Sequence, residues 1–222
     1  VLPETSAPSP GAFAEQFRSL GAGGAGGVLC VTLSSKLSAT YQAAVTAAEA
    51  VRDQVEVRVL DSLSVTMGEG LCALAAADAA ERGDDLEGVA AAAEATRATT
   101  QVFGALDTLD NLKKGGRVGG AQALVGSLLS IKPVIAVRDG LVEPESRQRT
   151  RSRSLDYLAG KLEGDWQIRR LAVVHAAAPD VGAFVEGLSS RYGEISVSYI
   201  GPVIGSHAGP GTIGVCFETK EA

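Results

Sequence analysis

The chain has 222 residues, of which 45% are hydrophobic and 21% are charged, and its formal net charge is −6. This composition is close to that of an average folded domain, so it excludes disorder and fibrous assembly. An acidic chain also lacks the charge for nonspecific phosphate neutralisation, and we predict no nucleic-acid partner. No apolar run approaches the ~20 residues that span a bilayer, and no secretory signal precedes the first elements.

The three cysteines are Cys30, Cys72 and Cys216, an odd and widely spaced set. Such a set fits neither a disulfide framework nor a metal site. We therefore expect reduced thiols in the core, no metal, no cofactor and a cytoplasmic location.

The first hundred residues alternate between helical and strand patterns. Ser9 followed by Pro10 is typical of a helix N-cap and first turn. The predicted elements are a helix from residue 10, a strand at 28–33, a helix at 41–51, a strand at 55–60, and helices at 68–82 and 86–96. This alternation predicts a parallel sheet, and we assign residues 1–100 to an α/β domain.

The pattern changes after about residue 100. The predicted elements are a strand at 101–106, a helix at 122–131, a hairpin at 133–149 that turns at Asp139-Gly140, a helix at 155–162, a strand at 169–174, a helix at 181–191, and strands at 195–200 and 212–218. A hairpin mixed with helices predicts an α+β domain at residues 101–222. No long linker separates the two halves, so we expect the domains to pack directly on each other.

The segment from Ser34 to Thr40 joins a buried strand to a helix and contains three serines and a threonine. In open α/β sheets ligands bind beyond the carboxyl ends of strands, where the next helix offers unpaired N–H groups. Helix capping accounts for one hydroxyl but not for the cluster. The segment therefore predicts a site for an anionic group, and the residues alone leave phosphate and carboxylate both open.

Two further turns are rich in hydroxyl groups. Residues 5–10 lead into the first helix, and residues 61–64 leave a strand. Each signal is weak alone, because Ser, Thr, Pro and Asp are common turn residues. If the three turns lie at one end of the sheet, their side chains converge on a single ligand.

The two histidines have different surroundings. His207 lies in residues 201–211, which contain too much Gly and Pro for a helix or a regular strand, so we expect it on a loop. A histidine held there can bind an anion or move a proton. His175 ends an apolar strand, and we expect a structural role for it.

The segment from Lys113 to Arg153 carries nine basic and three acidic residues in an otherwise acidic chain. Its arginines at 147, 149, 151 and 153 have the alternate spacing of one strand face. Residues 113–120 lack the order of a P-loop, so we predict no ATP site in this chain. The segment is either a solvated face or a dock for a phosphate or an acidic partner.

Catalysis by the chain itself has no clear signature. The sequence has no GxSxG elbow, and no serine is paired with a base at a recognisable spacing. We predict no catalytic residue.

Five segments resemble motifs of the DegV family of bacterial fatty-acid-binding proteins. They are residues 5–10 (TSAPSP, similar to TSQPSP), 33–42 (LSSKLSATYQ, similar to ISSKLSGTYQ), 112–118 (LKKGGRV, similar to LKKGGRI), 149–151 (RTR) and 205–211 (GSHAGPG, similar to GxHxGPG). They follow the family's order over nearly the whole chain and depart from it at Ala7 and Ala39. Family members open with a strand and an acidic TDS-type segment, so we expect the N-terminal part of the first domain to be missing here.

The resemblance implies the lipid-holding subunit of a two-component fatty acid kinase. By resemblance, the carboxylate of a long-chain fatty acid is held by Thr5 and Ser38, with Ser6, Thr40 and His207 nearby. The acyl chain then lies in an apolar tunnel between the domains, where each buried CH₂ contributes ~0.8 kcal/mol.

The resemblance also implies a partner and a second set of residues. Arg117, Arg149 and Arg151 are expected near the tunnel entrance, where a separate ATP-dependent kinase subunit converts the carboxylate to an acyl phosphate. The product would pass to phospholipid synthesis, with an acyltransferase at the membrane surface as a further partner.

Two alternatives stay open. The chain could be an acyl hydrolase that uses Ser38 and His207, or a noncatalytic regulatory protein whose basic segment binds another macromolecule. Acyl chain length, saturation and oligomeric state do not follow from the sequence.

Overall fold

The structure is a computed structural model that describes residues 3–124, 131–164 and 166–220. The helices are α1 (Pro10–Ala22), α2 (Thr40–Val51), α3 (Met67–Glu81), α4 (Leu86–Thr99), α5 (Asp110–Lys114), the 3₁₀ helix η1 (Gly119–Leu124), α6 (Arg151–Gly160), α7 (Val181–Tyr192) and α8 (Pro202–Ala208). The strands are β1 (Val28–Thr32), β2 (Val57–Asp61), β3 (Thr100–Ala105), β4 (Lys132–Arg138), β5 (Leu141–Gln148), β6 (Ile168–His175), β7 (Ser196–Tyr199) and β8 (Ile213–Thr219).

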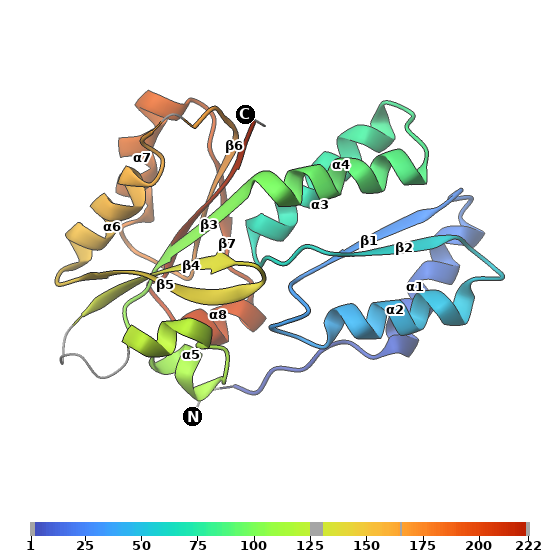
Figure 1. Cartoon of the computed structure of the whole chain (residues 1–222), viewed down its shortest axis with the longest axis horizontal. Helices are drawn as coiled ribbons and strands as arrows, with labels where there is room; N and C mark the ends of the chain where they lie inside the picture. Colours follow the sequence, from blue (N-terminus) through green and yellow to red (C-terminus); the bar gives the residue numbers. More distant parts are fainter. Residues whose placement is uncertain (1–2, 125–130, 165, 221–222) are drawn as a thin grey trace.

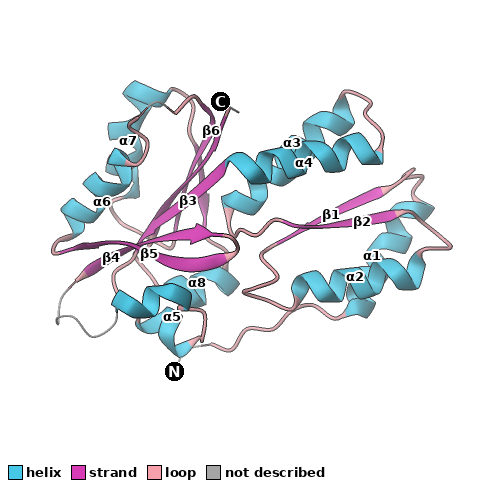
Figure 2. Cartoon of the chain, viewed as in Figure 1, coloured by secondary structure: helices cyan, strands magenta, loops and turns pink. Residues whose placement is uncertain are grey.

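The first sheet is the parallel pair β1 and β2. Helices α1 and α2 cover one face of the pair and α3 and α4 cover the other (Figure 2). Phe17 and Val51 belong to the core on one side, and Cys72 and Ala76 to the core on the other. Burial of both faces explains why β1 is an almost continuous apolar run, as predicted.

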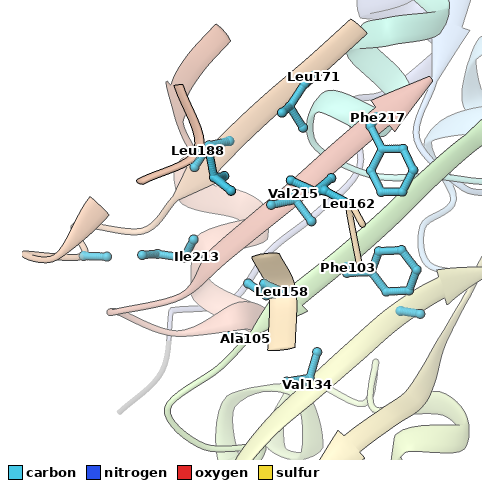
Figure 3. Close-up of a cluster of buried hydrophobic side chains, with 13 residues drawn as sticks. Phe103, Ala105, Val134, Leu158, Leu162, Leu171, Leu188, Ile213, Val215 and Phe217 are labelled. Carbon is cyan, nitrogen blue, oxygen red and sulfur yellow. The ribbon is translucent and has the colours of Figure 1, made fainter. Parts of the chain in front are cut away.

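The second sheet has six strands in the order β5-β4-β3-β8-β6-β7. Only its β6–β7 pair is parallel. One face packs against α6 and α7 around a cluster that includes Phe103, Leu158, Leu188, Val215 and Phe217 (Figure 3). The other face is turned toward the first sheet and the N-terminal segment (Figure 1).

The predicted fold class, a parallel-sheet α/β part with a second part of mixed α and β structure, is confirmed. The N-cap at Ser9 is also confirmed, because its Oγ accepts a hydrogen bond from Ala12 N at 3.2 Å. The predicted hairpin turns at Asp139 and Gly140, whose φ angles of 49° and 79° suit a tight two-residue turn. The domain boundary at residue 100, where α4 gives way to β3, stays a prediction.

Two local predictions were wrong or incomplete, and one short helix was missed. His207 lies in the short helix α8 rather than on a loop, because Pro202 occupies the first helical turn and Gly209 (φ 85°) lies just beyond its end. The helix predicted at 122–131 is a 3₁₀ turn up to Leu124, and residues 125–130 lie outside the described residues. The helix α5 was not predicted.

The alternating arginines do not share one strand face. Arg147 belongs to β5, Arg149 follows that strand, and Arg151 and Arg153 lie in α6. The chain changes from strand to helix at Thr150, whose side chain caps α6 by accepting a hydrogen bond from Arg153 N at 3.3 Å.

All three cysteines are free thiols. Burial raises the pKa of Cys72 and of Cys216 to about 11, so both thiols stay protonated near neutral pH. Across residues 3–124, 131–164 and 166–220 there is no cluster of His, Cys, Asp and Glu suited to a metal ion. No helix in these ranges combines the length and the apolar character needed to cross a bilayer.

Candidate functional site

A cavity of about 480 Å³ lies between the end of the first sheet and the free face of the second. It is bounded by the N-terminal segment, by the segments that follow β1 and β2, by strands β3, β4, β6 and β8, and by α8. Most of the lining is apolar, including Leu33, Leu37, Ile135, Val137 and Val174. A volume of this size fits one small-molecule ligand, since such pockets measure roughly 300–1,000 Å³.

Two glycines create the floor of the cavity. Gly104 on β3 pairs with Gly214 on β8, so the middle of the sheet carries no side chains at this point. A Cβ atom on Gly214 would lie 2.9 Å from a methyl carbon of Val174 and 3.0 Å from the Phe103 carbonyl oxygen. Because these two residues have no side chains, the cavity extends down to the backbone of the sheet at this point.

One end of the cavity carries the predicted hydroxyl groups. Thr5 Oγ1 lies 2.8 Å from His207 Nε2, and Ser38 Oγ lies 2.8 Å from Thr40 Oγ1. All four residues line the cavity, as does Ser6. The N-terminal segment, the turn before α2 and α8 therefore contribute hydroxyls and an imidazole to one site, a convergence that sequence order alone did not guarantee.

His207 lies against Gly115, which ends α5. A Cβ atom at position 115 would overlap the imidazole at Nδ1, so only glycine leaves room for the ring in this position. Burial, with a smaller contribution from the positive charge of Arg117, lowers the pKa of His207 below its usual value. The imidazole is therefore neutral near pH 7, and its Nδ1 is buried without a hydrogen-bond partner among the described residues.

Arg117 lies beside this end of the cavity and joins its walls. Its Nε donates to the Leu37 carbonyl at 3.1 Å, and its Nη1 donates to the Gly115 carbonyl at 2.8 Å. The guanidinium is exposed and lines the cavity. It places a positive charge next to the hydroxyl cluster, and its role as an entrance residue stays a prediction.

The first serine of the Ser34–Thr40 segment has a structural position. Ser34 is fully buried, its Oγ donates to the Gly140 carbonyl at 2.7 Å, and it accepts from Lys36 N at 3.2 Å. Ser35 does not line the cavity. Of the hydroxyls in this segment, Ser38 and Thr40 are the two that face the cavity.

The third hydroxyl-rich turn, residues 61–64, supports this segment instead of lining the cavity. Asp61 Oδ1 accepts from Ser35 N at 3.1 Å and from Leu63 N at 3.0 Å, and the Ser64 carbonyl accepts from Ser34 N at 2.8 Å. Only two of the three turns supply cavity hydroxyls.

Arg149 and Arg151 lie outside the cavity lining. Arg149 is exposed after β5. Arg151 forms two hydrogen bonds of 2.9 Å with the carboxylate of Asp180, which lowers the pKa of that carboxyl and fixes the start of α6. The charge of Arg151 is thus already paired within the chain.

His175 is buried, as its predicted structural role requires, but its hydrogen bonding is incomplete among the described residues. It is buried at the end of β6, and its ring centroid lies 4.3 Å from that of Tyr199. Its Nδ1 has no partner among the described residues.

One charged residue of the cavity lining was missed at the sequence level. Glu69, in the first turn of α3, contributes a carboxyl to the wall beside Val65 and Thr66. Burial raises the pKa of Glu69 to about 7. The only sequence signal is a lone acid in an Ala-rich helix, which is equally typical of a solvent-facing position.

The two sheets with a largely apolar cavity between them define an α/β protein whose cavity is large enough for one small-molecule ligand. A family model described as "Uncharacterised protein, DegV family" matches residues 1–220. The DegV domain-containing protein SCO2569 of Streptomyces coelicolor is 41% identical over 223 residues, which is 97% of this chain and 78% of that protein. Protein DegV of Bacillus subtilis is 32% identical over 97% of this chain and 79% of that protein. The chain therefore belongs to the DegV family.

Solved structures of the family have the same fold. A DegV family protein from Thermus thermophilus, described by its fatty acid binding, is 36% identical with a TM-score of 0.90 over 99% of this chain and 80% of that chain. DegV of Bacillus subtilis, described as a fatty acid binding protein, is 31% identical with a TM-score of 0.85 over 96% of this chain and 77% of that chain. A DegV family protein from Eubacterium eligens, loaded with heptadecanoic acid, is 25% identical with a TM-score of 0.83 over 98% of this chain and 80% of that chain.

Proposed function

We propose that this protein binds a long-chain fatty acid, with the carboxylate at the hydroxyl cluster and the acyl chain along the apolar cavity. The observation that carries the proposal is that one cavity combines apolar walls with a cluster of hydrogen-bonding side chains. Its walls are apolar, and one end holds Thr5, Ser6, Ser38, Thr40 and His207. The relatives described as fatty-acid-binding add support.

The hydroxyl cluster suits a carboxylate. A buried carboxylate is stable only if hydrogen-bond donors replace its water. The hydroxyls of Thr5 and Ser38 are hydrogen-bonded to His207 and Thr40, and a ligand carboxylate would accept hydrogen bonds from these hydroxyls in place of those partners. Because His207 is neutral, Arg117 is the cation beside the ligand. Tail burial at ~0.8 kcal/mol per CH₂ would supply most of the affinity.

We further propose that the bound acid is presented to a separate ATP-dependent kinase. A second hollow shares Thr5, Arg117 and His207 with the cavity, and its other lining residues include Glu4, Lys114 and Gly115. Its two cationic side chains suit the phosphate that would be transferred to the carboxylate. Arg149, which is exposed, is a candidate for contact with the partner, and Arg151 is a weaker one because Asp180 pairs with it.

The hydrogen bonds favour a binding role over hydrolysis. A serine nucleophile needs its base within hydrogen-bond reach. Ser38 Oγ is instead bonded to Thr40, and His207 Nε2 to Thr5. Turnover of acyl esters by the isolated protein, abolished in Ser38→Ala, would contradict the binding role.

Mass spectrometry of lipid extracted from the purified protein tests the proposal. We expect a long-chain fatty acid in near-stoichiometric amount, and loss of most of it in the double variant Thr5→Ala/Ser38→Ala. Thr46→Ala, which removes an exposed hydroxyl from α2, is the matched control and should retain the lipid. Absence of lipid, together with failure of added fatty acid to bind, would refute the proposal.

The kinase step has its own test, which is acyl phosphate formation with a bacterial fatty acid kinase subunit and ATP. Arg117→Gln should lower the rate at least tenfold and lower the amount of bound lipid much less, because tail burial supplies most of the affinity. Arg18→Gln, a surface charge change on α1, should leave the rate unchanged.

A further inference from the structure

The carboxyl of Glu69 is the feature of the cavity that the proposed function does not use. It lines the cavity together with Val65 and Thr66, whose hydroxyl is already bonded to the Val65 carbonyl. Within residues 3–124, 131–164 and 166–220 no hydrogen bond or ion pair to this carboxyl is found. Two nearby thiols, Cys30 and Cys72, have pKa values raised to about 11 and supply no positive charge, and Arg97 acts on Cys72 without an ion pair to Glu69 among the described residues.

The position of Glu69 along the cavity follows from the strand register. At the hydroxyl end, Thr212 donates to the Ala208 carbonyl at 3.0 Å, and the next residue, Ile213, pairs with Ala105. At the other end, Cys216 pairs with Val102, and its Sγ lies 3.6 Å from the Thr66 hydroxyl, three residues before Glu69. The three residue steps along β3 from Ala105 to Val102 span about 10 Å.

In the view of Figure 1 the first turn of α3 lies above the tip of the β4–β5 hairpin, and α8 and the N-terminal segment lie below it. Glu69 therefore meets the middle or the tail of a bound chain, not its carboxylate.

The Glu69 carboxyl affects which acyl chains fit the cavity favourably. Water can form hydrogen bonds with this carboxyl, but an unsubstituted hydrocarbon chain would displace the water and form no hydrogen bond in its place. A chain that bears a hydroxyl offers one hydrogen bond at the same place. Burial raises the pKa of Glu69 to about 7, so near neutral pH both its protonated and ionised forms are present, and each accepts a hydrogen bond from an alcohol.

We propose that Glu69 makes this cavity selective for acyl chains that carry a hydroxyl group, that is, for hydroxy fatty acids. The inference rests on the proposed fatty-acid function and adds the class of acyl chain to it. It assigns Glu69 a role in specificity and none in holding the head group.

The test compares octadecanoic acid with hydroxyoctadecanoic acids whose hydroxyl lies at successive carbons from mid-chain to tail, by titration calorimetry on the delipidated protein. We expect one hydroxyl position to bind at least tenfold more tightly than the plain acid in the wild type, a difference of about 1.4 kcal/mol. Glu69→Leu should abolish this preference by strengthening the plain acid and weakening the hydroxy acid. Glu69→Gln, which keeps an acceptor, should retain part of it.

Glu94→Gln removes an exposed carboxyl from α4 and controls for loss of charge. Circular dichroism of each variant separates loss of binding from loss of folding, and Glu69→Gln serves as the readout if Glu69→Leu does not fold. Tight binding of the plain acid with an unchanged ratio in the Glu69 variants would overturn this inference and leave the proposed function standing. Failure of the wild type to bind any of the acids would overturn both.

Discussion

Gly115 controls the head-group end of the cavity although it has no side chain. Its α-carbon faces the His207 ring so closely that a methyl group there would overlap Nδ1. Its backbone is in the ordinary helical region, with φ −78° and ψ −7°, so an alanine at this position strains no dihedral angle. A substitution therefore tests mainly the position of the imidazole, with a second close contact of 3.1 Å between the new Cβ and the Asn111 carbonyl oxygen.

We expect Gly115→Ala to displace His207 and to weaken fatty-acid binding at least tenfold, with a change in the free energy of unfolding below about 1 kcal/mol. Titration with fatty acid and urea denaturation measure the two quantities. Gly205→Ala is the matched control, because a Cβ there meets only the Ile200 carbonyl oxygen, at 3.9 Å. Wild-type affinity in Gly115→Ala would mean that the ring position is not needed for binding.

At the scale of elements, the β4–β5 hairpin fixes the turn that carries Ser38. The hairpin tip at Gly140 accepts the Ser34 hydroxyl at 2.7 Å, and Ser38 N donates to the Ser34 carbonyl at 3.2 Å. Ser34 thus links the second sheet to the turn before α2. Its buried hydroxyl determines where the two cavity hydroxyls of that turn lie.

Ser34→Ala should lower the free energy of unfolding by about 1–3 kcal/mol, because it leaves the buried Gly140 carbonyl without its partner and removes the acceptor of the part-buried Lys36 N–H. Urea denaturation monitored by circular dichroism measures the loss. Ser189→Ala removes an exposed hydroxyl from α7 and should change stability by less than about 0.5 kcal/mol. Equal stability of the two variants would show that Ser34 makes no net contribution.

Most elements were predictable because their signals are local. The apolar run of β1, the Ser9 cap of α1 and the Asp139-Gly140 turn depend on residues within a few positions. Ser34 and Ser38 look alike in sequence and differ in role, because the partner of Ser34 lies 106 positions away. Such a partner has no local signature.

The same limit applies to charges. Arg151 resembles its neighbours in the basic segment, but Asp180, 29 positions on, pairs with it. Glu69 was missed because a lone carboxyl on a helix gives no sign that its neighbours will be a cavity wall. Tertiary contacts decide both cases.

At the scale of the whole molecule, the cavity joins the two sheets. Its lining comes from the segments that follow β1 and β2 on one side and from β3, β4, β6 and β8 on the other. A ligand in it contacts both sheets and has no counterpart site in the unfolded chain. Ligand binding should therefore stabilise the entire fold.

Saturating fatty acid at about one hundred times its Kd should add about 2.7 kcal/mol to the free energy of unfolding. For a chain of this size that corresponds to a rise in Tm of roughly 5–10 °C. Scanning calorimetry should show the rise in a single transition. The primary alcohol with the same number of carbons should give a smaller shift, and an equal shift would mean that the carboxylate is not recognised.

The contact between Thr5 and His207 joins positions 202 residues apart. During synthesis, at roughly 5–20 residues per second, Thr5 leaves the ribosome at least ten seconds before its partner does. The first sheet and its helices can pack in that interval, but the head-group site cannot close. Occupancy of the cavity is therefore a late event in the life of the chain, and a truncated or stalled product would fold in part without acquiring it.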